Sequence, residues 1–177
     1  SNIIDLKLFE LVEKIKKKEI SSTEVAKAFI DRSQKSKKLN SYITENFENA
    51  LQKAKQFDEK PDFNKKLPGI PLAVKDLFCT KNIRTTAGSK ILENFIPTYE
   101  STVTQNILNE GGIITGKLNC DEFAMGSSNE TSFFGNVQNP ISENLVPGGS
   151  SGGSSSALAA KLTPVSYTHL TLPTKQM

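Results

Sequence analysis

Apolar residues recur at helical spacing through the first third of the chain. Between residues 5 and 18 they fall on one helix face, at Leu6, Phe9, Leu11, Val12 and Ile15. The run Ser21-Ser22-Thr23-Glu24 has the form of a capping box and predicts a second helix from Ser21 to about Ser36. A third helix is predicted from Glu48 to Glu59. Residues 1–66 are therefore expected to form a helical layer of the domain, polar on its outer side.

After Pro68 the pattern changes to short apolar runs. Residues 69–74 predict a buried strand with a proline near its start. Ser101 predicts the cap of a helix that ends at Gly111-Gly112, and residues 113–115 predict a second strand. A helix followed by a strand in this way is half of a parallel-sheet unit. We expect an α/β fold with a partial, mixed sheet flanked by helices and centred on strands near 70–75 and 113–117.

The pattern is less regular further along the chain. Asp121 predicts the cap of a short helix toward Met125. Residues 147–156 are nearly all glycine and serine, and Ala157 to Leu162 predict a helix. The glycine/serine stretch has two interpretations that the pattern leaves equal. It is either a flexible linker or a loop whose backbone N–H groups approach a ligand at a helix start.

Composition indicates a polar globular protein of one domain. The 177 residues are 36% hydrophobic and 23% charged, with a net charge of +3. No apolar run approaches the roughly 18 residues of a membrane span, and no signal peptide is recognisable, so a cytoplasmic location is expected. Cys79 and Cys120 are far apart and are expected to be reduced thiols. With a single histidine, they do not suggest a metal site.

The basic residues are densest at Lys14, Lys16, Lys17 and Lys18. One interpretation is contact with RNA phosphates. The other is a solvated helix face, because Glu13 and Glu19 are interleaved with the lysines. We favour the solvated face.

Two glycine motifs resemble known catalytic loops but lack required parts. Residues 111–117 nearly match a phosphate-binding loop, yet Leu118 stands where that loop needs a hydroxyl, and the run follows a helix. Residues 148–152 match the G-x-S-x-G pattern of a nucleophile elbow. That elbow needs a preceding strand and a histidine, whereas the only histidine is His169, near the end of the chain. We favour neither a nucleotide-binding loop nor a Ser-His-Asp hydrolase.

Four segments together resemble the amidase signature family. Residues 67–76 resemble its lysine-bearing strand, and residues 85–89 the loop that follows. Residues 116–127 resemble its central block, although Cys120 stands where methionine is common. Residues 146–154 resemble the glycine/serine signature itself. The resemblance covers residues 1 to about 165 and implies the N-terminal part of the amidase-signature fold, with residues 67–165 as a partial core.

The resemblance implies a Ser-cisSer-Lys triad without histidine. Lys75 takes the place of the catalytic lysine, and Ser150, after a cis Gly149–Ser150 bond, that of the bridging serine. The supporting loop is Gly148, Gly149, Ser151, Gly152 and Gly153. Burial disfavours an ammonium group and lowers the pKa of a lysine, which makes it a usable base. Ser150 would relay the proton, and we expect about 2.6–3.5 Å between Nζ and Oγ.

Residues 121–127 further resemble the glutaminase subunits of tRNA-dependent amidotransferases. In these, a serine attacks the glutamine side-chain amide, and the ammonia passes to the B subunit, which activates Glu-tRNA with ATP and magnesium. The small C subunit wraps around the glutaminase subunit. The resemblance thus implies the B and C subunits as partners, tRNA contact only through the B subunit, and no cofactor or metal in this chain. Two alternatives remain open: a stand-alone amidase for another amide, and a non-catalytic binding module.

The chain departs from the family after Val165. The family continues with a glycine-rich segment whose last serine is the acyl-ester nucleophile. Residues 166–177 contain no glycine and have no family character, and we interpret them as a misjoined tail. Thr174 lies near the expected distance but lacks the surrounding motif, so it is assigned no role. The nucleophile is therefore expected to be absent, and the chain by itself inactive.

Overall fold

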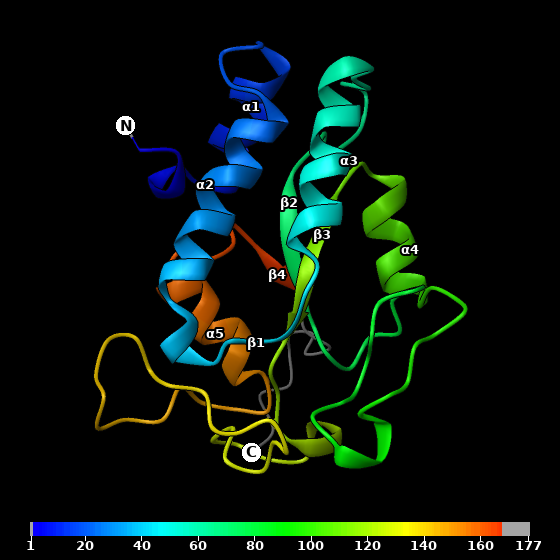
Figure 1. Ribbon diagram of the computed structural model, residues 1–177. Coiled ribbons are helices and arrows are strands. Elements are labelled where there is room, and N and C mark those ends of the chain that lie inside the picture. The colour runs from blue at the N-terminus through cyan, green and yellow to red at the C-terminus, as the bar shows by residue number, and fades with distance from the viewer. Residues whose placement is uncertain (1, 168–177) are drawn as a thin grey trace, which may run out of the picture.

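The computed structural model describes residues 2–167 and has a mixed α/β architecture (Figure 1). Its α-helices are α1 (Leu8–Lys16), α2 (Ser22–Lys35), α3 (Phe47–Glu59), α4 (Thr102–Asn109) and α5 (Gly152–Ala159). Its short 3-10 helices are η1 (Ile3–Asp5), η2 (Lys37–Leu39), η3 (Lys90–Leu92) and η4 (Glu122–Ala124). The expected α/β class is confirmed.

One four-stranded sheet has the order β1-β3-β2-β4. Its strands are β1 (Tyr42–Glu45), β2 (Pro71–Lys75), β3 (Ile113–Leu118) and β4 (Ser166–Tyr167). β2 runs parallel to both β3 and β4, whereas β1 is antiparallel to β3. The sheet is therefore mixed, and its centre is formed by the two strands that the sequence predicts.

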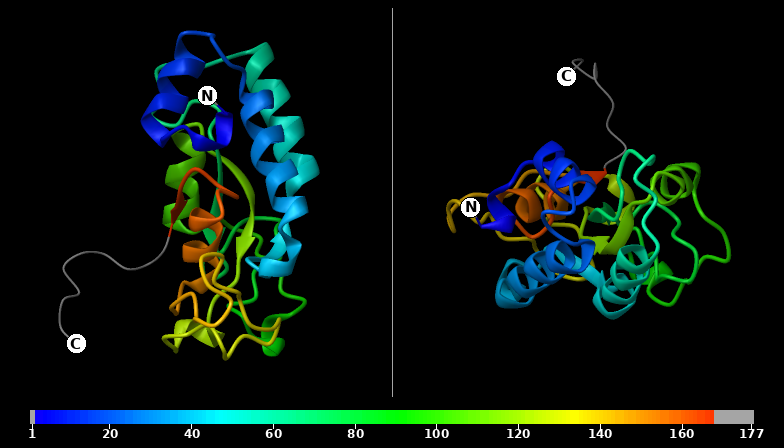
Figure 2. Two further views of the ribbon diagram at one scale, coloured as in Figure 1. Left: turned by 90° about the vertical axis from the view of Figure 1, so that its left-hand side faces the viewer. Right: turned by 90° about the horizontal axis from the view of Figure 1, so that it is seen from above.

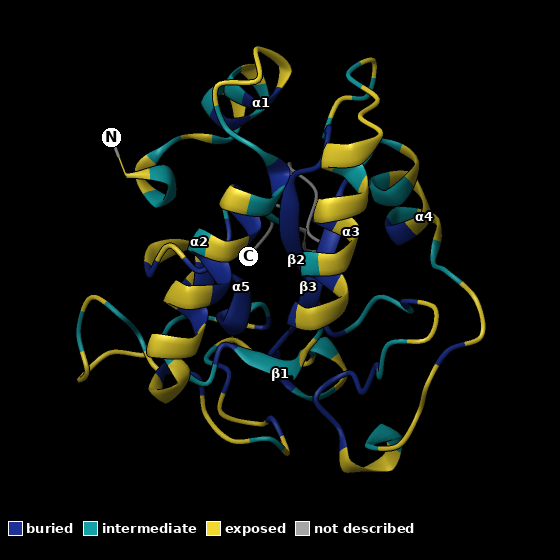
Figure 3. Cartoon of the chain, turned by 45° about the horizontal axis from the view of Figure 1, so that its top comes forward, coloured by how far each residue is buried: buried dark blue, intermediate teal, exposed yellow. Residues whose placement is uncertain are grey.

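The helices cover both faces of the sheet. Side chains alternate along β2, so Ala73 and Lys75 share one face, and Leu72 and Val74 the other. Ala73 packs in a cluster with Ala157 of α5, and α2 and α3 pack on Ile113 of β3. Leu72 and Val74 pack instead with Ile107 and Leu108 of α4. The central strands are consequently buried along their whole length (Figure 3).

The N-terminal helices follow the predicted order. Ser21 and Glu24 form both halves of the capping box, since each side chain accepts the other's backbone N–H. The helices α2 and α3 lie side by side along the sheet (Figure 2). The helix α1 is shorter than predicted, and η1 precedes it. The residues before position 67 also contain β1, which the sequence analysis missed.

The helix α5 corrects two predictions about the glycine/serine stretch. It begins at Gly152, inside that stretch, and ends at Ala159, whereas the sequence predicted a helix from Ala157 to Leu162. The early start depends on packing, because a Cβ at Gly153 would lie 2.4 Å from the Asn119 carbonyl oxygen. Tertiary contact here overrides the low helix propensity of glycine. The linker interpretation is therefore wrong.

Asp121 was predicted to cap a short helix, and this is only partly correct. A short helix, η4, does follow it, but the Asp121 side chain makes no capping hydrogen bond. Its carboxylate accepts instead from Asn129 and Thr131, further along the loop. A longer-range set of donors therefore replaces the local cap.

The sheet continues past the expected boundary at residue 165. Backbone pairing joins Ala73 to Ser166 and Val74 to Tyr167. The remainder of the proposed tail, with His169 and Thr174, lies outside the described residues.

The lysine cluster near α1 has local partners. Lys14 pairs with Glu19 at 2.6 Å, Lys17 with Glu13 at 3.8 Å, and Lys18 lies over the Phe63 ring. These contacts match the favoured interpretation of a solvated helix face. Among residues 2–167, no helix is long and apolar enough to cross a membrane.

Candidate active site

Lys75 and Ser150, the two residues predicted to be catalytic, are in contact. The Lys75 Nζ donates to the Ser150 Oγ at 2.7 Å, although 75 residues separate them in the chain. Lys75 is fully buried, and Ser150 is 6% exposed. Lys75 is the last residue of β2, and the site therefore lies at the carboxyl end of the central parallel strands. That is the edge where open α/β sheets usually bind ligands.

The turn that carries Ser150 is held by backbone contacts. The Gly149–Ser150 peptide bond is cis, as expected, and Gly148 has a φ of +84°, a conformation that favours glycine. The Ser150 carbonyl oxygen accepts from the Asp121 backbone N–H at 3.0 Å. Gly152 and Gly153 begin α5 directly after the turn, with the half-buried Ser151 between turn and helix. The supporting loop thus leads into α5, and its Ser150 connects the start of that helix to the end of β2 through the hydrogen bond with Lys75.

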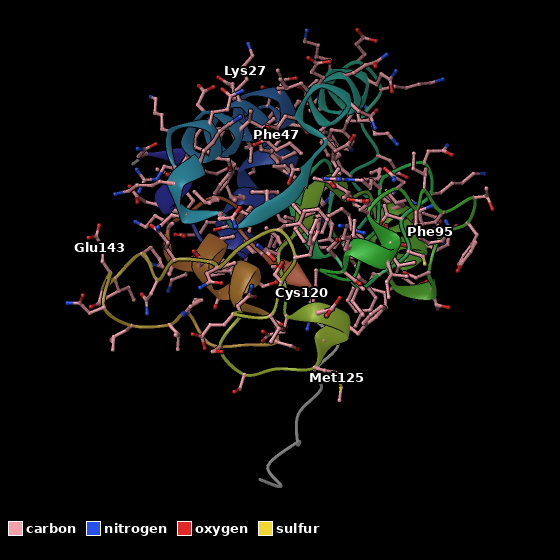
Figure 4. The ribbon with its side chains drawn as sticks, turned by 60° about the horizontal axis from the view of Figure 1, so that its bottom comes forward. Lys27, Phe47, Phe95, Cys120, Met125 and Glu143 are labelled. Atoms are coloured by element: carbon pink, nitrogen blue, oxygen red, sulfur yellow. The ribbon has the colours of Figure 1, made fainter. Side chains whose placement is uncertain are left out.

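Electrostatic surroundings favour the neutral amine of Lys75. Burial lowers the pKa of Lys75 from its ordinary value, and the nearby Cys120 and Asp121 oppose that shift. Burial also raises the pKa of the Cys120 thiol to about 12, so this thiol is uncharged near neutral pH. Cys120 lies inside the molecule, whereas Met125 projects outward from the loop that follows (Figure 4). Asp121 is consequently a charged group that favours the ammonium form.

A second buried lysine lies on the opposite face of the sheet. Lys117 approaches the Asp76 carboxylate at 3.4 Å, and both side chains are fully buried. The Lys117 Nζ also donates to the Phe78 carbonyl oxygen and to the Thr85 hydroxyl. Asp76 follows Lys75 directly, and the alternation of side chains directs it away from the Lys75 face. The sequence did not lead us to expect this ion pair. The alternation of side chains along the predicted strand could have indicated that Asp76 lies on the face opposite Lys75.

Replacing Gly149 with alanine should separate Ser150 from Lys75. An added Cβ would lie 2.2 Å from the Asp121 Oδ2 and 2.7 Å from backbone atoms of Ser127 and Ser128, so the turn must move. A crystal structure of Gly149→Ala should show a longer Nζ–Oγ distance. Ser155→Ala is the control, because Ser155 is an exposed residue of the same glycine/serine stretch and the change adds no atom to the turn. An unchanged distance in Gly149→Ala would show that the turn is not tightly fixed.

The described residues contain no cluster of three or more side chains that could hold a metal ion. Both cysteines are free thiols, one buried at position 120 and one half-buried at position 79.

The mixed sheet, the cis serine turn and the buried lysine define the class of amidase-signature proteins. The family model described as Amidase matches residues 24–168, and the chain belongs to this family.

Relatives with high identity share one name, the A subunit of glutamyl-tRNA(Gln) amidotransferase. The chain is 74% identical over 165 residues to the protein of this name from Pelagibacter ubique (strain HTCC1062), covering 93% of this chain and 34% of that protein. The protein of the same name from Rickettsia bellii (strain OSU 85-389) is 52% identical over 161 residues. The match covers 87% of this chain and 33% of that protein. The chain thus spans about a third of the length of these relatives.

Solved structures agree with the family. The A subunit of glutamyl-tRNA(Gln) amidotransferase from Thermotoga maritima has a TM-score of 0.75 at 30% identity, covering 91% of this chain and 33% of that one. A fatty acid amide hydrolase has a TM-score of 0.86 at 26% identity. The match covers 93% of this chain and 30% of that one. Both therefore share the fold that carries the Lys75–Ser150 contact.

Proposed function

We propose that this chain supplies the lysine and the bridging serine of a glutamine-hydrolysing site. The observation that carries the proposal is the 2.7 Å contact between the buried Lys75 amine and the Ser150 hydroxyl. Burial lowers the pKa of Lys75, which increases the fraction of amine able to accept a proton. The supporting loop of Gly148, Gly149, Ser151, Gly152 and Gly153 holds the serine in place.

In the proposed reaction, the proton moves away from the attacking serine in two steps. Ser150 accepts the proton of the nucleophile's hydroxyl and passes its own proton to the Lys75 amine. The nucleophile attacks the amide carbon of glutamine to form an acyl ester. The amide nitrogen takes the proton back from Lys75 through Ser150 as its bond to carbon breaks, and it leaves as ammonia. Water then hydrolyses that ester and releases glutamate. The nucleophile is not among the described residues, and we expect the chain alone to release no ammonia.

The names of the relatives, together with the resemblance of residues 121–127 to glutaminase subunits, support the substrate and partners of this proposal. Proteins named as the A subunit of glutamyl-tRNA(Gln) amidotransferase are 74% and 52% identical to this chain. We propose that the complete protein works in a cytoplasmic complex with the B and C subunits of such an enzyme. It would pass ammonia to the B subunit, which uses ATP and magnesium. Contact with tRNA would then occur through the B subunit.

A chimeric enzyme tests this proposal. In the chimera, the 165-residue matched segment of this chain replaces its counterpart in the Pelagibacter relative. Ammonia release is measured from glutamine, asparagine and simple aliphatic amides, with and without the relative's partner subunits. We expect glutamine to be the preferred substrate and the isolated chain to be inactive.

The other outcomes separate the alternatives. Faster release from another amide, independent of partner subunits, would favour a stand-alone amidase. Absence of hydrolysis in a folded chimera that still binds its partner subunits would favour a non-catalytic binding module.

A further inference from the structure

Asp121 has a buried carboxylate that accepts several hydrogen bonds from a single loop. It lies after β3 and is fully buried. The Asp121 Oδ2 accepts from the Asn129 backbone N–H at 3.0 Å. The Asp121 Oδ1 accepts from the hydroxyl of Thr131 at 2.9 Å and from its backbone N–H at 3.3 Å. Among residues 2–167 it has no ion-pair partner, so these donors stabilise the charge.

The same residue also contacts the serine turn. Its backbone N–H donates to the Ser150 carbonyl oxygen at 3.0 Å. Its Oδ2 lies 2.2 Å from the place that a Cβ on Gly149 would occupy, so the turn rests directly against the carboxylate. On the other side, a Cβ on Gly126 would lie 2.3 Å from the Asp121 Cγ. Asp121 is therefore enclosed between its own loop and the turn that carries Ser150.

We propose that Asp121 is a positioning residue of this site, which holds the Gly149–Ser150 turn so that the Ser150 hydroxyl stays against Lys75. The proposal rests on the proposed function above. Asp121 acts through Ser150 and through its own charge, and no contact with substrate is required of it. A displacement of about 1 Å at a reacting group reduces catalysis by about 100-fold. A residue that fixes the position of this turn therefore has a large effect on the rate.

The charge of Asp121 gives the proposal a second, separable consequence. Cys120 and Asp121 both favour the ammonium form of Lys75, and Cys120 is neutral near pH 7. Asp76 lies on the opposite sheet face, paired with Lys117, and α5 carries no ionisable side chain. Removing the Asp121 charge therefore lowers the pKa of Lys75 further. The neutral amine then persists to lower pH, and the acid limb of the pH–rate profile moves to lower pH.

The test compares Asp121→Asn with Thr131→Val in the chimera. Asp121→Asn should reduce kcat for glutamine about 100-fold with little change in KM, and move the acid limb to lower pH. Thr131→Val removes one donor but keeps the charge, so it should reduce kcat less and leave the acid limb unmoved. An unchanged kcat in Asp121→Asn would overturn the proposal. So would a loss of activity with an unmoved acid limb, because a purely structural role predicts that result.

Hydrogen exchange keeps this test independent of the proposed function. In Asp121→Asn, backbone amides of residues 146–156 should exchange faster than in the unsubstituted chimera, while those of α3 stay unchanged. If the unsubstituted chimera hydrolyses no glutamine, the proposed function fails. The exchange result still shows whether Asp121 holds the Gly149–Ser150 turn in place. Equal exchange of residues 146–156 in both proteins would overturn the positioning role.

Discussion

Replacing Lys75 with methionine should reduce glutamine hydrolysis by the chimera about 10⁴- to 10⁶-fold, the loss typical of removing one member of a catalytic unit. Methionine keeps an apolar stem in the same space but offers no amine to accept the proton from Ser150. Ammonia release at saturating glutamine measures the effect. Lys53→Met, an exposed change on α3, is the matched control and should retain full activity.

Stability separates this loss from unfolding. The Lys75 side chain is fully buried, and methionine removes the cost of burying an amine. The midpoint of urea unfolding should therefore stay the same or rise in Lys75→Met. Activity within tenfold of the unsubstituted chimera would contradict the proposed role of Lys75. A large fall in stability would show that the amine is instead part of the structural core.

The second large effect concerns stability at the other buried lysine. Lys117→Met should destabilise the chain by about 3–5 kcal/mol, because it leaves the Asp76 carboxylate buried without its cation. Within residues 2–167, the Asp76 Oδ1 has no hydrogen-bond partner apart from that 3.4 Å ion pair. Equilibrium urea unfolding of the chain, followed by circular dichroism, measures the loss. Adding Asp76→Asn to Lys117→Met should restore part of it, because no buried charge then remains.

The pH dependence of this loss has a definite sign. Burial raises the pKa of Asp76, and the neighbouring Lys117 opposes that shift. Without Lys117, the carboxyl stays protonated in the folded chain to still higher pH. Asp76 then takes up a proton when the chain folds. The free energy of unfolding of Lys117→Met therefore falls as the pH rises above the ordinary pKa range of an aspartate. The deficit of Lys117→Met relative to the unsubstituted chain should therefore grow with pH, and a constant deficit would contradict this account.

The elements specified by local signals could be predicted from the sequence. The capping box at Ser21 fixes the start of α2, and the Ser101 side chain accepts from the Thr104 N–H at the start of α4. The strand β1 has only four residues, and it depends on pairing with β3, about seventy residues away. The start of α5 depends in the same way on contacts with Asn119 and Asn129. Non-local contacts of this kind leave no periodicity in the chain.

The candidate site was predictable only in part. Lys75 and Ser150 were found through the resemblance of their segments to a family, because nothing local relates two residues so far apart. The spacing of apolar residues alone would have left Lys75 as an exposed residue at a strand end. The position of Asp121 between its own loop and the Ser150 turn was not predictable, since it depends on the packing of two glycines against a carboxylate.

The most direct test of the central claim is ammonia release from glutamine by Ser150→Ala and Ser155→Ala in the chimera. Both changes remove one hydroxyl from the same glycine/serine stretch. Of these two serines, Ser150 contacts Lys75, whereas Ser155 is exposed and donates to the Pro147 carbonyl oxygen. The account predicts a loss of about 10⁴-fold or more for Ser150→Ala and activity close to the unsubstituted chimera for Ser155→Ala. Equal activity of the two variants would contradict the claim that Ser150 relays a proton to Lys75.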